Sequence, residues 1–271
     1  MHLAALHLHP VKSLRALSVQ SARVDRDGIV GDRRFMVVDP AGVFMTQRTH
    51  PRMARVGAFL EGDSLVLRCA GFAELRVGRE PDAKAPLVSV SIWKSEGLQA
   101  EDCGRAPCEW LGGAIGAPCR LVRIGPAFRR SAKGAAPDGG DTVAFADAYP
   151  FLLTSEASLA DLNGRLGSGA VPMSRFRPNL VVSGCLPYEE DTWKRLRIGG
   201  IPFRGAGPCS RCAITTTDQE TGERGVEPLR TLAGYRRDPR EPSHVNFGQN
   251  LVHEAKSGVL RVGDPVKPLQ K

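Results

Sequence analysis

The sequence has none of the features that direct a protein into a membrane or a secretory pathway. No apolar run approaches the roughly 18 residues that a membrane-spanning helix requires. Residues Met1–Leu6 carry no basic segment and no long apolar core, so they do not resemble a signal peptide. We therefore expect no membrane partner and a cytoplasmic location.

The sequence also lacks a cysteine pattern typical of disulfide-linked domains. It has seven cysteines, an odd number that is widely scattered. Without a secretion signal, this arrangement argues against a disulfide framework. We expect five of them to be small buried hydrophobic residues, at positions 69, 103, 108, 119 and 185.

Recognised nucleic-acid-binding motifs are missing as well, although the net charge is +8. The arginines are spread along the chain, and we find no zinc-finger, aromatic RNP-like or helix-turn-helix pattern. A basic balance favours an anionic ligand but does not specify one. We therefore predict an anionic small molecule and no nucleic-acid partner.

Regular alternation of strands and helices is not evident, which disfavours Rossmann and TIM-barrel folds. Short strands separated by turns are common instead, as in Arg34–Val38, the turn Asp39–Gly42, and Val43–Met45. The 271 residues suffice for one large or two modest domains. The sequence thus predicts a mostly β fold of the α+β class. Further strands are expected at residues 65–67, 179–182 and 259–262, with a hairpin over 196–203 that turns at Gly199-Gly200.

A few helices interrupt these strands. The clearest should begin at Ser155, a good N-cap residue, and end near Gly167, with Leu159, Leu162 and Leu166 on one face. Shorter helices are expected over 107–115 and 229–235. Residues 125–141 are basic and then glycine-rich without apolar periodicity, so we interpret them as a mobile connection between two halves.

The sharpest local motif is Cys209-Ser210-Arg211-Cys212, a C-x-x-C spacing that follows a glycine-rich run. A structural zinc site would need two more ligands, and no second C-x-x-C exists. A thioredoxin-like dithiol should open a helix, which Thr215–Thr217 disfavour. A single thiolate ligand beside Arg211 suits a redox metal. Two inert buried cysteines remain the fourth interpretation.

Basic and polar residues near strand ends form a second candidate site for an anion. Arginine, lysine, serine and asparagine in such loops bind phosphate groups. Taken one at a time, each is better explained as an ordinary surface residue, as most arginines are. The set comprises Lys12, Ser13, Arg33, Arg34, Arg175, Arg177 and Asn179.

Together these motifs carry a resemblance to a known family that runs nearly from end to end. The chain resembles the MOSC superfamily, named for the C-terminal domain of molybdenum cofactor sulfurases, and within it the amidoxime-reducing-component subgroup. The matching segments are Pro10–Ser13, Asp32–Phe35, Pro150–Leu153, Ser155–Leu159, Phe176–Asn179, Cys209–Cys212 with Thr215, Thr216 and Asp218, and Phe247–Gln249.

The resemblance implies an architecture and a cofactor site. Residues 1–122 would form the MOSC N-terminal β-barrel-like domain and residues 123–271 the MOSC β-barrel domain, with a molybdenum–molybdopterin cofactor in the cleft between them. Cys212 would be the catalytic metal ligand. The other cofactor-binding residues would be Lys12, Ser13, Arg34, Arg177, Asn179, Ser210 and Arg211. The chain departs from the family at Ala148-Tyr149, where a relative has Thr-Ser, so Ala148 has no side-chain hydrogen bond to offer.

The implied activity is that of a molybdenum-dependent oxidoreductase that reduces N-hydroxylated substrates such as amidoximes and hydroxylamines. No ferredoxin-type C-x₄-C-x₂-C spacing is present, so electrons would come from a separate ferredoxin, flavodoxin or cytochrome with its reductase. The alternative is a molybdenum cofactor carrier or sulfur-transfer module, since a shared fold does not fix function.

Overall fold

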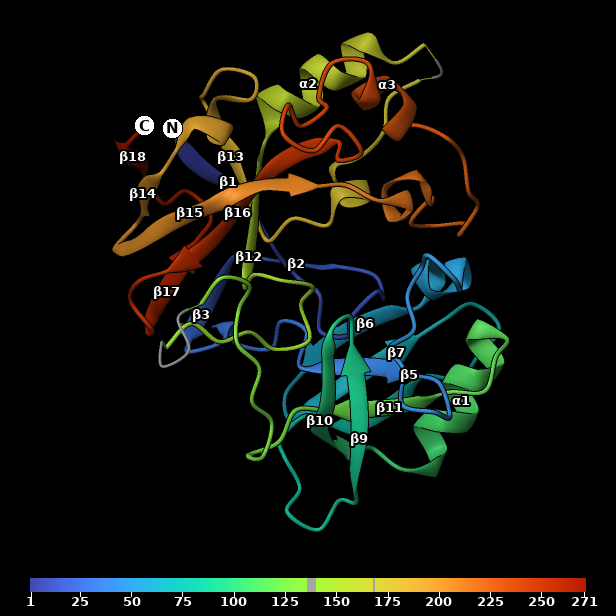
Figure 1. The fold of residues 1–271 in the computed structure, drawn as a ribbon. Coiled ribbons are helices and arrows are strands. Elements are labelled where there is room, and N and C mark those ends of the chain that lie inside the picture. The colour runs from blue at the N-terminus through green and yellow to red at the C-terminus, as the bar shows by residue number, and fades with distance from the viewer. Residues whose placement is uncertain (136–139, 168) are drawn as a thin grey trace.

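The computed structural model describes residues 1–135, 140–167 and 169–271. They form an upper and a lower lobe, with both termini at one edge of the upper lobe (Figure 1). None of the helices in these ranges combines the length and apolar composition that a bilayer crossing requires.

The upper lobe is built on an eight-stranded sheet to which both ends of the chain contribute. The strand order is β18-β14-β15-β16-β12-β13-β1-β2, and only β12 and β13 pair in parallel. The N-terminal strand therefore completes a sheet made mostly by the C-terminal half. The strands are β1 (His2–Leu8), β2 (Leu17–Val19), β12 (Phe151–Ser155), β13 (Leu180–Ser183), β14 (Arg195–Ile198), β15 (Ile201–Ser210), β16 (Asn246–His253) and β18 (Val266–Gln270).

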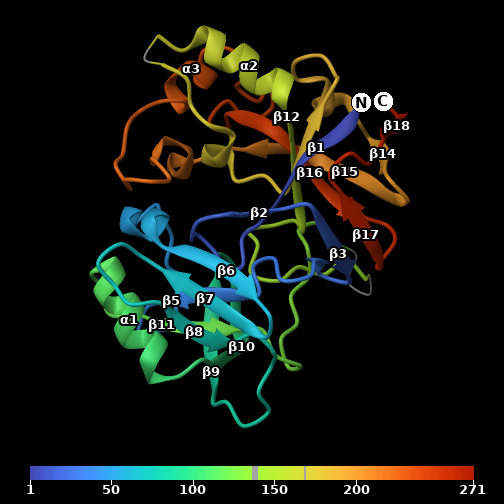
Figure 2. The ribbon, with the colours of Figure 1, turned by 180° about the vertical axis from the view of Figure 1, so that it is seen from behind.

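The lower lobe contains two smaller sheets and one long helix. One sheet has the order β5-β11-β10-β9 and the other β6-β7-β8, and α1 (Arg105–Ile115) packs beside them (Figure 2). The strands are β5 (Phe35–Val38), β6 (Gly57–Glu61), β7 (Ser64–Arg68), β8 (Leu75–Gly78), β9 (Leu87–Ile92), β10 (Ser95–Asp102) and β11 (Arg120–Arg123). A third small sheet, β17-β3-β4, lies between the lobes and consists of β3 (Ser21–Asp25), β4 (Gly28–Ile29) and β17 (Gly258–Arg261).

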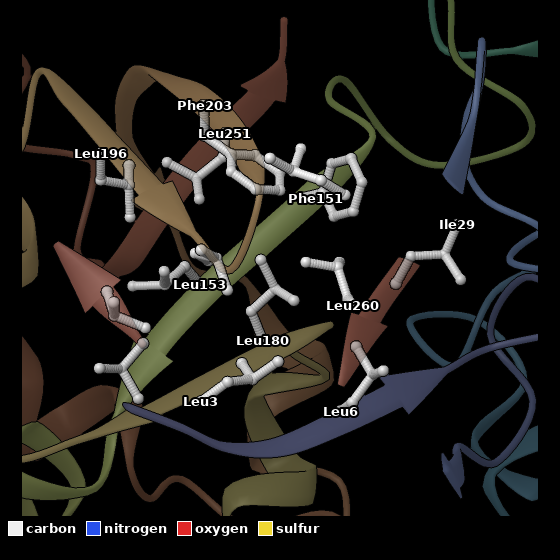
Figure 3. Close-up of a cluster of buried hydrophobic side chains, with 14 of the residues drawn as sticks. Leu3, Leu6, Ile29, Phe151, Leu153, Leu180, Leu196, Phe203, Leu251 and Leu260 are labelled. Atoms are coloured by element: carbon white, nitrogen blue, oxygen red, sulfur yellow. The ribbon is translucent and has the colours of Figure 1, made fainter. Parts of the chain in front are cut away.

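Each lobe has its own hydrophobic core. Leu3 and Leu6 from β1 pack with Phe151, Leu180 and Leu251 in the upper lobe (Figure 3). The lower core is formed separately around residues such as Phe35, Leu65 and Leu121. Burial of these side chains stabilises the two lobes independently of any ligand.

Short helices cover the upper sheet and carry the loops of the site. The predicted cap is confirmed, because the Ser155 hydroxyl accepts a hydrogen bond from the Ser158 amide at 3.1 Å. The hairpin turn at Gly199-Gly200 is also confirmed between β14 and β15. These elements are α2 (Glu156–Arg165), α3 (Leu229–Ala233) and the 3₁₀ helices η2 (Met173–Phe176), η3 (Glu189–Thr192) and η4 (Ala213–Thr216), whereas the 3₁₀ helix η1 (Pro51–Arg55) belongs to the lower lobe, where Met53 joins its core.

Two expectations were wrong in detail. Residues 43–45 form no strand of their own, because Val43 and Phe44 make only isolated bridges, to Ser91 and Val38. In the expected mobile connection, residues 136–139 lie outside the described residues, but Phe128 and Arg130 are buried. Arg130 donates hydrogen bonds to the carbonyls of residues 144, 146 and 147, so this part of the segment is packed against its surroundings.

Candidate functional site

A cleft of about 410 Å³ brings together most of the residues that the sequence singled out. Both lobes contribute to its lining, as expected of a cofactor site between two domains. Seven of the eight predicted site residues line it: Lys12, Ser13, Arg177, Asn179, Ser210, Arg211 and Cys212.

Cys212 lies where the chain leaves β15 and enters η4. Its carbonyl accepts a hydrogen bond from the Thr215 amide at 3.0 Å, which fixes the start of this turn. Its half-buried sulfur accepts a hydrogen bond from Arg48 Nη1 at 3.2 Å. The thiol is therefore both accessible from the cleft and adjacent to a cation.

Cys209 sits in a different environment, although it belongs to the same motif. Its sulfur accepts a hydrogen bond from Arg211 Nη1 at 2.9 Å, and Arg211 Nη2 donates to the Phe176 carbonyl at 2.6 Å. The β15–β16 pairing is irregular between Gly205 and Ser210, so the motif departs from regular sheet geometry. Both cysteines are free thiols.

The geometry narrows the interpretations of the C-x-x-C spacing. Within the described ranges, no group of three or more histidine, cysteine, aspartate or glutamate side chains is placed to hold a metal. The described residues therefore do not bring together the set of ligands that closes a tetrahedral zinc site. Cys212 precedes only a four-residue 3₁₀ helix, whereas a thioredoxin-like dithiol opens an α-helix. A single cysteine ligand in the cleft remains compatible with the structure.

Lys12 places a buried positive charge in the wall of the cleft. Its ammonium donates hydrogen bonds to the Phe145 carbonyl at 2.8 Å and to the Asp147 carboxylate. Burial lowers the pKa of Lys12 to about 8, and Asp147 opposes that shift. Lys12 is therefore charged below about pH 8 and gains a neutral form above it.

Arg33 lines the cleft, whereas the predicted residue Arg34 does not. Arg33 Nη1 donates to Asp32 Oδ2 at 2.5 Å and to Asn179 Oδ1 at 2.8 Å. The Arg34 guanidinium instead pairs with Asp25 at 2.7 Å and with Asp27 at 3.2 Å, outside the cleft lining. The structure thus places Arg33 in the cleft where Arg34 was expected, and a positive φ of 47° at Arg33 changes the direction of the chain before β5.

Arg177 and Asn179 complete the basic wall. Arg177 Nη1 donates to the Leu14 carbonyl at 2.7 Å, and burial together with the Arg33 charge lowers the pKa of Arg177 to about 9. The Asn179 amide bonds within the protein, to Leu152, His7 and Arg33, so it braces the wall. It is thus better placed to orient Arg33 than to bind a ligand directly.

Backbone strain is concentrated around this cleft. Among the described residues, five non-glycine residues have positive φ, and Ser13, Arg33 and Arg177 all line the cleft. A fourth, Trp93, donates from Nε1 to Asp147 Oδ1 at 3.1 Å, and Asp147 also lines it. Strained conformations persist where the surrounding structure holds them, and they are enriched at functional sites.

Sequence reasoning missed several residues of this site. Asp147, Ala148 and Tyr149 form one side of the cleft, and Lys133 adds another cation. Arg48 and Trp93 lie beside it through their contacts with Cys212 and Asp147. The Ala148-Tyr149 departure from the family pattern had directed attention to this segment, but no motif indicated Arg48 or Trp93.

Comparisons with known proteins agree with the geometry. A model of the MOSC N-terminal beta barrel domain matches residues 1–118, and a model of the MOSC domain matches residues 140–267. Mitochondrial amidoxime-reducing component 1 of Mus musculus is 38% identical over 97% of this chain and 81% of its own length. Mitochondrial amidoxime reducing component 2 of Homo sapiens is 34% identical over 97% of this chain and 82% of its own length.

Molybdenum cofactor sulfurase of Oryza sativa subsp. japonica is 32% identical over 94% of this chain, which corresponds to only 33% of that protein. The relatives named mitochondrial overturn the expectation of a cytoplasmic location, which rested only on missing targeting signals. The family matches extend over both lobes of the fold. The chain therefore belongs to the MOSC family, in the group of the amidoxime-reducing components.

Proposed function

We propose that this protein is a molybdenum-cofactor-dependent reductase of N-hydroxylated compounds, with Cys212 as the protein ligand of the metal. The observation that carries the proposal is one cleft that contains an accessible cysteine sulfur and a wall of cations from both lobes. The amidoxime-reducing components and the molybdenum cofactor sulfurase among its relatives support the same cofactor and activity.

The residues present fit a molybdopterin cofactor. Lys12, Arg33 and Arg177 offer positive charge for its phosphate, and the Cys212 thiolate is a soft ligand suited to a redox metal. Within the described structure, Arg211 Nε and Arg48 Nη2 are buried without a hydrogen-bond partner. Such orphaned donors are costly unless a ligand or water satisfies them.

The bound cofactor supplies the redox couple that cleaves an N–O bond, and the protein positions it and restricts access. Lys12, Arg33 and Arg177 are held by internal hydrogen bonds, so little reorganisation is needed when an anion binds. Cys212, which lines the cleft, would hold the metal. Electrons would come from a separate donor protein of the ferredoxin, flavodoxin or cytochrome type with its reductase.

We also propose residues 1–122 and 123–271 as the two domains. The matches to residues 1–118 and 140–267 support this division. β1 and β2 nevertheless belong to the sheet of the second domain, so the two units are interlocked.

The test is elemental and pterin analysis of wild type, Cys212→Ala and Cys209→Ala, all purified from a cofactor-producing host. We expect Cys212→Ala to lose molybdenum and amidoxime reduction, whereas Cys209→Ala keeps its metal. Unchanged molybdenum in Cys212→Ala would refute the ligand role. Metal-loaded wild type that reduces neither amidoximes nor hydroxylamines with a chemical donor would favour a carrier or sulfur-transfer role instead.

A further inference from the structure

The sulfur of Cys212 is contacted by a side chain from the other half of the sequence. Arg48 Nη1 donates to Cys212 Sγ at 3.2 Å, and the two residues are 164 positions apart. Arg48 lies between β5 and η1, whereas Cys212 follows β15 of the upper lobe. The N-terminal half thus reaches the one atom on which the proposed metal site depends.

Arg48 is held in place at both its backbone and its side chain. Arg224 donates to the carbonyls of Gln47, at 2.7 Å, and of Arg48 itself. The guanidinium lies over the ring of Trp93, 4.4 Å from its centroid. Trp93 is in turn fixed by the hydrogen bond from its Nε1 to Asp147. The orientation of Arg48 toward the sulfur is therefore determined by direct contacts with Arg224 and Trp93, and Asp147 supports Trp93 in turn.

The backbone conformation and the exposure of Trp93 both make it a poor contributor to the stability of the fold. It lies in the tight turn between β9 and β10 with a φ of 53°, and it is 52% exposed. A bulky residue in the left-handed region is strained, and an exposed ring recovers little of the hydrophobic gain. Strain of this kind, next to a functional cleft, indicates that the side chain serves the site.

We propose that Arg48 and Trp93 are positioning residues that set the reduction potential of the metal held by Cys212. This inference rests on the proposed function. A hydrogen bond to a metal-bound sulfur withdraws electron density from it and stabilises the reduced, more electron-rich metal. Arg48 therefore raises the potential at which the metal accepts electrons, and Trp93 keeps Arg48 aimed at the sulfur.

The test compares the reduction potential of the bound molybdenum, measured by redox titration with electron paramagnetic resonance, in wild type and Arg48→Met. We expect a lower potential, an altered signal and a roughly 10–100-fold lower turnover, with molybdenum and pterin content retained. Arg55→Met is the matched control, because Arg55 is exposed in the neighbouring η1. It should leave potential and turnover unchanged, and Arg48→Lys should recover part of the wild-type potential.

Trp93→Ala is the second variant, because it keeps Arg48 but removes the ring against which the Arg48 guanidinium packs. It should shift the potential in the same direction by a smaller amount, whereas Trp93→Phe, which keeps a ring under Arg48, should shift it less than Trp93→Ala. A wild-type potential in metal-loaded Arg48→Met or in Trp93→Ala would overturn the inference while leaving Cys212 as the ligand. If Cys212→Ala keeps its molybdenum, the ligand role in the proposed function fails. That result is distinguishable from an unchanged potential in Arg48→Met, which contradicts only the role of Arg48.

Discussion

Two groups of side chains around the cleft differ in how they are held. The basic group, Lys12, Arg33 and Arg177, is bound by carbonyls, two carboxylates and an amide of the protein itself. The cysteine group, Arg48, Trp93 and Cys212, exposes an aromatic ring and leaves Arg48 Nη2 without a partner among the described residues. The positive charges that would bind the cofactor's phosphate are therefore held in place by the protein before a ligand binds. Arg48, beside the proposed metal site, instead has an N–H group that can still donate a hydrogen bond.

This comparison predicts that the largest loss follows from damage to the basic group. Arg33→Met should lower the free energy of unfolding by about 3–5 kcal/mol, because it leaves the buried Asp32 carboxylate without its charged partner. It should also reduce the pterin content of the purified protein. Urea denaturation and pterin analysis check both effects.

Arg34→Met is the matched control, since Arg34 pairs with Asp25 and Asp27 away from the cleft. It should lose some stability and keep its pterin. Equal loss of pterin in both variants would contradict the placement of Arg33, rather than Arg34, in the site.

Titration of Lys12 should have a smaller effect, both on the free energy of unfolding and on the affinity for the cofactor. Its pKa is about 8 in the folded protein and 10.5 when unperturbed, so between these values the unfolded chain binds more protons. The contribution of Lys12 to the free energy of unfolding should therefore rise with pH across this range. Affinity for the cofactor's phosphate should fall as pH rises through about 8, because Lys12 loses its charge.

The change in cofactor affinity can be measured as the amount of pterin that the protein retains during dialysis below and above pH 8. Lys12→Met should bind more weakly and lack this step in its pH profile. A step of the same size in the variant would assign the titration to another group.

The local elements of this fold were predictable, whereas the assembly of the site was only partly so. Ser155 caps α2 and Gly199-Gly200 turns the hairpin because both signals act within a few residues. The entry of β1 into the upper sheet depends on pairing with β13, far along the chain, which no local pattern encodes. Family motifs identified Lys12, Arg177 and Cys212 because each sits in a short, distinctive sequence.

The remaining site residues escaped prediction for physical reasons. Arg33 and Arg34 both belonged to the candidate anion site, but the turn at Arg33, with its positive φ, decides which of the two arginines enters the cleft. Arg48 meets Cys212 across 164 positions, and Trp93 meets Asp147 across 54. Contacts at such separations arise only when both lobes are folded.

The smallest expected effect on stability concerns the cysteine group. Trp93→Gly should relieve about 1–2 kcal/mol of backbone strain and lose a similar amount of packing against Phe44 and Arg48. The free energy of unfolding should thus stay within about 1 kcal/mol of wild type, as measured by urea denaturation. A loss of more than about 3 kcal/mol would show that Trp93 supports the fold, and the contrast between the two groups would weaken.

The account depends most on the bond between Cys212 and the metal, which molybdenum-edge X-ray absorption measures directly. Cys212→Ser offers an oxygen of similar geometry in place of sulfur. Compared with wild type, the metal of this variant should have one sulfur neighbour fewer, whereas Cys209→Ser should match wild type. An unchanged sulfur shell in Cys212→Ser would contradict the assignment of Cys212 as the ligand.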